Sequence, residues 1–257
     1  MTKAKNSLLS LACGDAYGNA YEMQGLSGSV FTMEDLPKRA KIKHYTDDTK
    51  MSMILWMHYS NYGFIDKEKL MASYREWAVK DGLADGIGLH TYAVLVEGKT
   101  DKNSQGNGTV MRVIPFANRL IEEGKPFKEV LQWMNIDAAL THDNAIIKAV
   151  NHLALDLSIH GLKTLKDAKH SFIVAQLKPG NTAWIVHTLH HVIEVLKMNI
   201  GMLDAFKELV SRGGDTDTNC AIYAAIKGYN DCFELTLEDF LDAPSIKILQ
   251  YVLSSGK

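Results

Sequence analysis

Apolar residues recur at three- and four-residue spacing along most of this chain, and this periodicity constrains the fold more than any other feature. Segment 181–199, NTAWIVHTLHHVIEVLKMN, shows the pattern clearly. One side of its expected helix carries Trp184, Ile185, Thr188, Val192, Val195 and Leu196. Segments 126–140 and 143–161 have the same period, with Pro126 near the start of the first and Gly161 at the end of the second. All three predict helices.

A fourth helix is predicted over residues 66–82, DKEKLMASYREWAVKDG, which has an aspartate cap, early acids and a closing glycine. Convincing alternating strands are absent, and the whole chain has only 5 prolines. We therefore expect an all-α protein of about ten or more helices. No linker rich in Pro, Gly or Ser and no fixed repeat divides the chain, so residues 1–257 are expected to form a single domain. The least helical regions, 21–45 and 98–108, are long loops of the kind that often carry function.

Composition excludes several classes of protein. A length of 257 residues is enough to bury a core, and a net charge of −2 argues against a general nucleic-acid binder. No run of 18 apolar residues is present, so no membrane span is expected. Gly14 and Asp15 interrupt the apolar run near the N-terminus, which we therefore interpret as mature sequence. The 3 cysteines lack CxxC spacing, and their odd number favours a reducing compartment, the cytoplasm by default.

Two aspartates stand side by side in HYTDDTKMSM, residues 44–53, just before an apolar run. One interpretation is a helix cap, in which Asp47 or Asp48 accepts amide hydrogen bonds and the helix dipole favours both acids. The other is a site for a hard cation. Adjacent carboxylates at a helix start diverge, and a neighbouring threonine adds a neutral oxygen ligand. The segment alone leaves both interpretations open.

A second acidic pair occurs some 170 residues downstream, in RGGDTDTNCAIYAAIKG from Arg212 to Gly228. Asp215 and Asp217 alternate with threonines, two glycines before them allow a tight turn, and a helix rich in small residues follows. A helix cap again accounts for the pattern. Burial of an unpaired acid pair is costly, however, and a metal ion would supply the counter-charge. The two segments could together hold two cations, as in two-metal hydrolytic sites.

Three further segments combine small residues with polar ones. In SQGNGTVMR, residues 104–112, the two glycines form a turn whose backbone amides suit phosphate oxygens, although such a turn is usually only a loop. We expect Arg112 to brace the core through a buried ion pair. In LACGDAYGNAYE, the structural interpretation of Asp15 is a hydrogen-bond hub, and that of Glu22 is a solvated loop acid. His142, at a helix junction, is of a kind that is more often structural than catalytic.

In this order, the five segments resemble the motifs of the ADP-ribosylglycohydrolase family, of the dinitrogenase-reductase-activating glycohydrolase type. That family runs GDAxGxxxE, TDDT, SxGNGxxMR, TH and GGDTDT. The corresponding residues here are Gly14–Gly18 with Glu22, Thr46–Thr49, Ser104–Arg112, Thr141–His142 and Gly213–Thr218. The matches span residues 14 to 218, most of the chain, and GIGLHTYAVL from Gly86 is a fainter echo of another family segment.

The resemblance implies an all-α, single-domain enzyme with two divalent cations, Mg²⁺ or Mn²⁺. The implied metal ligands are Thr46, Asp47, Asp48, Asp215, Asp217 and Thr218. It also implies hydrolysis of the glycosidic bond at the anomeric carbon of the distal ribose of ADP-ribose, with Glu22, Asp48 and Asp217 as catalytic residues. The positions that match residues near the diphosphate and ribose are Ser104, Gly106, Asn107, Gly108 and His142.

The implied partners are an ADP-ribosylated protein or a small ADP-ribosyl conjugate, with ADP-ribose as the product. Nucleic acid is expected only as an ADP-ribosylated substrate, and a monomer is expected. The acceptor stays open between arginine nitrogen, serine oxygen, a nucleobase and an acetyl ester, as does the choice between Mg²⁺ and Mn²⁺. Asn144 and Ala145 stand where many family members have His and Pro, a departure that bears on substrate preference.

Two alternative functions follow from the same residues. An HD-type metal phosphohydrolase would use the His142–Asp143 pair as metal ligands, but it leaves both Asp/Thr clusters unexplained. A catalytically inactive relative would bind ADP-ribose or serve as a structural protein. Against that alternative, all six implied ligands and Glu22 are present.

Overall fold

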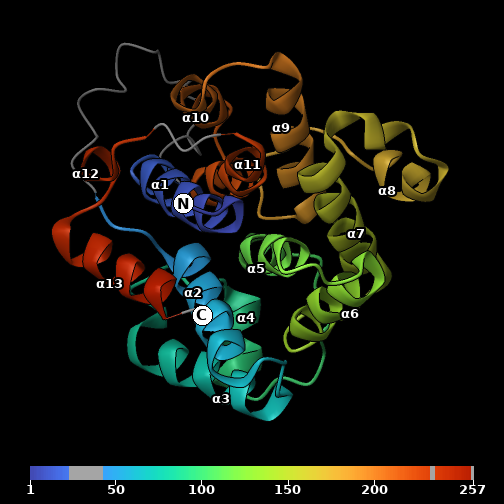
Figure 1. Cartoon of the computed structure of the whole chain (residues 1–257). Coiled ribbons are helices and arrows are strands. Elements are labelled where there is room, and N and C mark those ends of the chain that lie inside the picture. Colours follow the sequence, from blue (N-terminus) through green and yellow to red (C-terminus); the bar gives the residue numbers. More distant parts are fainter. Residues whose placement is uncertain (23–42, 232–234, 256–257) are drawn as a thin grey trace.

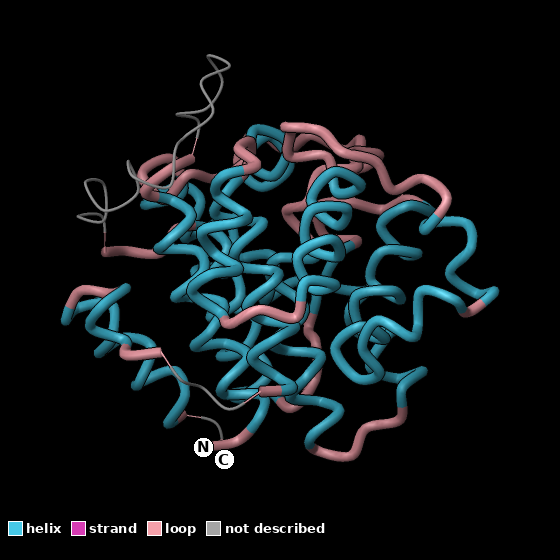
Figure 2. The backbone as a smooth tube through the Cα atoms, turned by 90° about the horizontal axis from the view of Figure 1, so that it is seen from above, coloured by secondary structure: helices cyan, strands magenta, loops and turns pink. Residues whose placement is uncertain are grey.

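The computed structural model describes residues 1–22, 43–231 and 235–255, and every regular element within these ranges is helical (Figures 1 and 2). The α-helices are α1 Lys3–Asn19, α2 Asp47–Tyr62, α3 Lys67–Trp77, α4 Leu89–Leu95, α5 Val110–Glu122, α6 Phe127–Ala138, α7 Ala145–His160, α8 Ser171–Val174, α9 Ile185–Met198, α10 Met202–Ser211, α11 Thr216–Asn230, α12 Leu237–Phe240 and α13 Ala243–Ser254. Three short helices of other types are η2 Ala78–Gly82, η3 Gly161–Lys166 and η4 Ala168–His170. The all-α prediction is confirmed.

The four helices predicted from periodicity are all present. Segments 126–140, 143–161 and 181–199 contain α6, α7 and α9. Segment 66–82 contains α3, which continues as the π-helix η2. The predicted cap of α3 is also present, since the Asp66 side chain accepts a hydrogen bond of 3.1 Å from the amide of Lys69.

Helices α1 and α11 form the centre of the molecule and lie side by side in Figure 1. Both are buried around most of their circumference, as expected for helices rich in small and apolar residues. Gly14 and Gly18 permit their close approach. A Cβ atom at Gly18 would overlap the carbonyl oxygen of Thr216, and one at Gly14 would overlap that of Cys220. This packing places Asp15 of α1 beside the first turn of α11.

The surrounding helices complete the core. Helices α2, α5 and α10 pack on α1, while α5, α7, α9 and α10 pack on α11. Residues 98–108 contain no helix, as expected. The other expected loop, 21–45, lies for the most part outside the described residues. Among the helices described, none combines the length and the apolar character that crossing a membrane requires.

Candidate active site

Two helix N-termini from distant parts of the chain meet beside α1. Helix α2 begins at Asp47 and α11 at Thr216, after a turn in which Gly213 and Gly214 have φ values of 70° and 80°. Such positive φ values favour glycine. The Thr218 hydroxyl donates a hydrogen bond of 3.3 Å to Oδ2 of Asp48 across 170 positions of sequence. The two acidic segments noted in the sequence therefore form one site.

Six carboxylates gather at this junction, which we call the acidic centre: Asp15, Glu22, Asp47, Asp48, Asp215 and Asp217. Carboxylate oxygens of Asp15, Asp48 and Asp217 lie within 4.8 Å of one another, as do those of Glu22, Asp215 and Asp217. Within the described residues, none of these six acids forms an ion pair with a lysine, arginine or histidine. Among the residues that the structure describes, the centre is thus a concentration of negative charge that no cationic side chain neutralises.

Asp15 is the hydrogen-bond hub of the acidic centre, in agreement with the structural interpretation of its sequence motif. Its carboxylate accepts bonds from the amides of Thr46 and Thr49, at 2.9 and 3.0 Å, and from both hydroxyls, at 2.7 and 2.6 Å. Asp15 therefore caps α2 from a neighbouring helix. Because the Thr46 hydroxyl proton is donated to Asp15, the lone pairs of its oxygen stay available to another group.

The acids of α2 do not serve as its caps. Asp48 Oδ2 accepts from the Thr218 hydroxyl, while Asp48 Oδ1 is buried with no hydrogen-bond partner. Asp217 differs, because its Oδ1 accepts a bond of 2.8 Å from the Thr218 amide. A buried carboxylate oxygen without a partner is costly. The helix-cap interpretation therefore fails to account for Asp48.

Burial and the repulsion of neighbouring acids raise the pKa values of Asp47, Asp48 and Asp217 in this centre. Burial, followed by the charges of Asp15 and neighbouring acids, raises the pKa of Asp47 and Asp48 well above the usual carboxyl value. Burial, followed by the charges of Asp215 and Asp48, likewise raises the pKa of Asp217 well above the usual carboxyl value. Burial also raises the pKa of Asp15 to about 6, although hydrogen bonds from Thr49 and Thr46 partly offset it. Carboxylates in this state favour a cation among them.

The donor set fits a hard divalent cation. It consists only of carboxylate and hydroxyl oxygens, the ligands that Mg²⁺ and Mn²⁺ prefer. Two observations support this fit. Asp48 Oδ1 is buried without a hydrogen-bond partner. Asp217 also belongs to both groups of three closely spaced carboxylates described above. Four of the six predicted ligands line the adjoining cavity: Asp47, Asp215, Asp217 and Thr218. The other two are joined to the centre by hydrogen bonds, Asp48 to the Thr218 hydroxyl and Thr46 to Asp15.

A cavity of about 770 Å³ adjoins the acidic centre. Its wall includes Glu22, Asp47, Asp215, Asp217, Thr218, the loop 104–108, His142, residues 86–91 and residues 181–184. All five predicted substrate-binding positions lie in this wall. The volume is in the range of small-molecule sites, and acids line one end of it.

The loop 104–108 is tied to the acidic centre through the side chain of Asn107. Its Nδ2 donates to Oδ2 of Asp215 at 2.8 Å and to the Thr188 hydroxyl at 3.0 Å. The backbone amides of Gly106 and Asn107, which the sequence suggested for phosphate oxygens, are engaged elsewhere. They donate to Ser104 Oγ and to the Ala183 carbonyl. Asn107 instead positions Asp215.

His142 is held neutral in the cavity wall. Burial, followed by the charges of Arg112 and His90, lowers its pKa to about 3. Arg112 braces the core as expected, with Nε 2.7 Å from Oδ2 of Asp137, and its Nη2 donates to the Thr141 hydroxyl at 3.0 Å. That hydroxyl lies 2.9 Å from His142 Nδ1. The hydrogen-bond network assigns Nδ1 as the acceptor, which leaves Nε2 as an N–H donor toward substrate.

Sequence reasoning assigned no role to two stretches of the cavity wall. Residues 86–91 belong to GIGLHTYAVL, where the ring of His90 lies 4.7 Å from that of His142, edge to face. The second stretch, 181–184, holds the loop 104–108 in place: Trp184 Nε1 donates to Gln105 Oε1 at 2.9 Å. The first stretch had a faint motif that pointed to it. The second stretch had no such motif, because the apolar spacing of segment 181–199 indicated only a helix.

The geometry does not support an HD-type phosphohydrolase. Asp143 is half exposed and forms an ion pair of 2.7 Å with Lys148. Among the described residues, no group of metal-binding side chains includes His142 or Asp143. The His-Asp pair of the sequence is therefore not a metal site in this fold.

Comparisons with known proteins agree with the sequence resemblance. The sequence model of the ADP-ribosylglycohydrolase family matches residues 1–230. The ADP-ribosyl-[dinitrogen reductase] glycohydrolase of Rhodospirillum rubrum is 25% identical over 88% of this chain and 84% of its own length. A protein of Acanthamoeba polyphaga mimivirus, provisionally named an ADP-ribosyl glycohydrolase, is 22% identical over 99% of this chain and 96% of its own.

A solved structure of an ADP-ribosylglycohydrolase-related protein complex has the same fold. It superposes with a TM-score of 0.73 at 20% identity, over 98% of this chain and 96% of that chain. Identity at this level establishes the fold alone.

Proposed function

The chain belongs to the ADP-ribosylglycohydrolase family of hydrolases, and we propose that its hydrolysis of the bond between ADP-ribose and an acceptor depends on two divalent cations at the acidic centre. The observation that carries this proposal is the convergence of six carboxylates, four of them buried, which form no ion pair with a lysine, arginine or histidine of the described residues. Asp47, Asp48 and Thr46 would hold cations from α2. Asp215, Asp217 and Thr218 would hold them from α11.

Glycosidic cleavage passes through a state in which positive charge grows on the sugar. The carboxylates around the end of the cavity favour that charge, because they surround it at short range with little screening by water. Divalent cations held by these residues would supply Lewis-acid chemistry, which lowers the pKa of water and favours a fixed orientation of the sugar. Orientation of reactants can lower a barrier by about 7–11 kcal/mol.

Glu22 is our candidate for the base that takes the proton from the attacking water. It lies in the cavity wall, within 4.8 Å of Asp215 and Asp217. Burial, followed by the charges of Asp215 and Asp15, raises its pKa, which makes it a better base near neutral pH. General-base catalysis accelerates a reaction by about 10²–10⁴-fold, which is a smaller acceleration than the orientation of the reactants can give. Asp48 and Asp217 are proposed to act on the reaction through the cations.

The substrate's remaining parts would extend along the cavity wall toward His142. Its Nε2–H can donate to a diphosphate or ribose oxygen, and Ser104, Gly106 and Gly108 give the wall its small-residue surface. The substrate is an ADP-ribosylated protein or a small ADP-ribosyl conjugate. We propose a cytoplasmic site of action from the cysteine pattern.

The test is release of ADP-ribose from a panel of ADP-ribosylated arginine, serine and nucleic-acid substrates and O-acetyl-ADP-ribose, with Mg²⁺ or Mn²⁺. We expect Asp48→Asn and Asp217→Asn each to lower kcat by at least about 10³-fold, because both orientation and water activation are lost. His142→Ala is expected to raise KM by about tenfold and to change kcat little, since it removes one hydrogen bond to bound substrate.

Asp143→Ala is the matched control, because this acid is exposed and lies next to His142 in sequence. It should keep near-full activity. Near-full activity in Asp217→Asn with metal present would refute the site. Tight binding of ADP-ribose without turnover on any substrate would instead identify a binding protein.

A further inference from the structure

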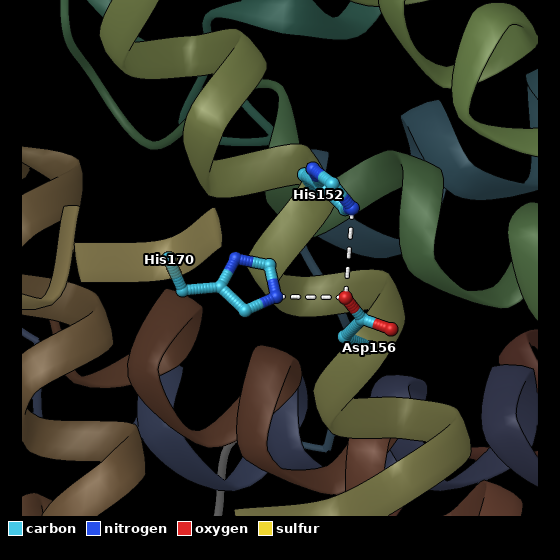
Figure 3. A group of neighbouring side chains, drawn as sticks. All are labelled: His152, Asp156 and His170. Atoms are coloured by element: carbon cyan, nitrogen blue, oxygen red, sulfur yellow. Dashed lines mark hydrogen bonds and ion pairs between the residues drawn. The ribbon is translucent and has the colours of Figure 1, made fainter. Parts of the chain in front are cut away.

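A second cluster of ligand-type side chains lies on α7 and η4 and shares no residue with the acidic centre. Figure 3 shows His152, Asp156 and His170 pointing toward one another. His170 Nε2 lies 2.7 Å from Asp156 Oδ2, and His152 Nε2 lies 3.5 Å from the same oxygen. A third imidazole, His160, has its Nε2 3.8 Å from Asp156 Oδ1. Three histidines thus converge on one carboxylate.

The local sequence explains this convergence. His152, Asp156 and His160 are four residues apart on α7, so their side chains lie along one face of that helix. The chain then turns through η3 and returns His170 to the same carboxylate. Asp156 and His170 are buried, with 1% side-chain exposure each, whereas His152 and His160 are 29% and 49% exposed. The cluster therefore has a buried side, formed by Asp156 and His170, and a solvent-exposed side, formed by His152 and His160.

Hydrogen bonds within the chain use only one of the two carboxylate oxygens of Asp156. Asp156 Oδ2 already accepts from His170 Nε2 and lies 2.7 Å from Lys169 Nζ. Asp156 Oδ1, in contrast, is buried without a hydrogen-bond partner. The carboxylate therefore offers an unused oxygen to a group that is not part of the chain.

The spacing of the donor atoms suits a four-coordinate transition metal. Ligands about 2.0–2.1 Å from a tetrahedral Zn²⁺ ion lie about 3.3 Å from one another. The separations of 2.7 and 3.5 Å from Asp156 Oδ2 to His170 Nε2 and His152 Nε2 bracket this value.

We propose that His152, Asp156 and His170, with His160 as a fourth ligand, form a binding site for Zn²⁺ or a similar transition-metal ion. Imidazole nitrogen with one carboxylate is a donor set that selects such metals over Mg²⁺. Lys169 takes the place of the ion in its absence, since its ammonium group neutralises Asp156. This lysine is 45% exposed, so it can swing into solvent when a metal binds.

A metal at this site would fasten η4 and α8 to α7. That connection now includes the His170–Asp156 bond, the Lys169–Asp156 ion pair and the edge-to-face packing of His152 and His170 at 4.8 Å. The proposed role is structural and independent of glycoside hydrolysis.

The experiment measures Zn²⁺ affinity of the full chain by competition with a chromophoric chelator, in excess Mg²⁺ to occupy the oxygen-only acidic centre. Wild type should bind one Zn²⁺ that is lost in His152→Ala/His170→Ala. Each single variant should weaken binding by at least about tenfold, because loss of a partner outside the ligand set already costs about 10–100-fold. Lys169→Gln should bind Zn²⁺ more tightly, because the competing cation is gone.

Two controls separate this site from others. His190→Ala, on α9, removes a histidine that makes no contact with the cluster and should leave Zn²⁺ affinity unchanged. Asp48→Asn tests binding at the acidic centre and should also leave it unchanged. The gain expected in Lys169→Gln cannot arise from misfolding. The proposal is overturned if wild type binds no Zn²⁺, if the double histidine variant binds it as wild type does, or if Lys169→Gln shows no gain.

Discussion

At the residue scale, the buried carboxylates of the acidic centre have different roles. Asp15 accepts four hydrogen bonds and caps α2, so its charge is stabilised by the protein itself. Asp48 has only the hydroxyl of Thr218 and leaves Oδ1 unpartnered. The difference separates an acid that supports the structure from one that is available to a ligand, although both are completely buried.

The pH dependence of metal-free stability tests this distinction. The folded-state pKa of Asp48 is raised above that of the unfolded chain, about 3.9, so its stability contribution is present at low pH and lost as pH rises through the raised value. In chelator, we expect Asp48→Asn to be more stable than wild type at pH 8. The difference should shrink as the pH falls toward the unfolded-state value of about 3.9, because the folded and the unfolded wild type then both bind the proton. Urea unfolding at pH 8 and at lower pH measures it, and a pH-independent difference would contradict this account.

At the element scale, the pairing of α1 with α11 decides whether the site exists. Gly14 and Gly18 lie four residues apart on one face of α1, against the backbone of α11. Their lack of a side chain lets the Asp15 hub and the Asp217 carboxylate lie within one cluster. The family motif GDAxG therefore contains two packing residues around one hydrogen-bonding residue.

Gly18→Ala tests the helix contact. Alanine gains up to about 1 kcal/mol in helix propensity, yet its Cβ would overlap the backbone of Thr216 and Asp217. We expect a net loss of about 1–3 kcal/mol in the free energy of unfolding, together with weaker Mg²⁺ binding. Gly201→Ala is the control, because nothing lies within 4 Å of its added Cβ. Equal stability of the two variants in urea would show that α1 and α11 are not in close contact.

At the scale of the whole molecule, the acidic centre joins residues 15, 22, 46–48 and 215–218, which are far apart in the chain. A ligand that binds only this folded arrangement must stabilise the whole protein. The same network supports the expected single domain, because helices from both ends of the chain pack on one another (Figure 1).

Thermal unfolding with and without Mg²⁺ tests both points. At 100 times the dissociation constant, binding adds about 2.7 kcal/mol, which corresponds to a rise in Tm of about 5–10 °C for a domain of this size. We expect one cooperative transition that shifts as a unit, and no shift in Asp48→Asn/Asp217→Asn. Two transitions, of which only one responds to Mg²⁺, would contradict a single domain.

The helical class, the positions of α3, α6, α7 and α9, and both acidic segments follow from the amino-acid sequence alone. Each depends on residues close together in the chain, through helical period, caps and motif spacing. The sequence left three matters open: whether Asp47 and Asp48 are caps, whether the amides at 106 and 107 are free, and what residues 181–184 do. The folded arrangement answers these questions, because each depends on a partner remote in sequence: Asp15 for α2, Ala183 for Asn107, and Gln105 for Trp184.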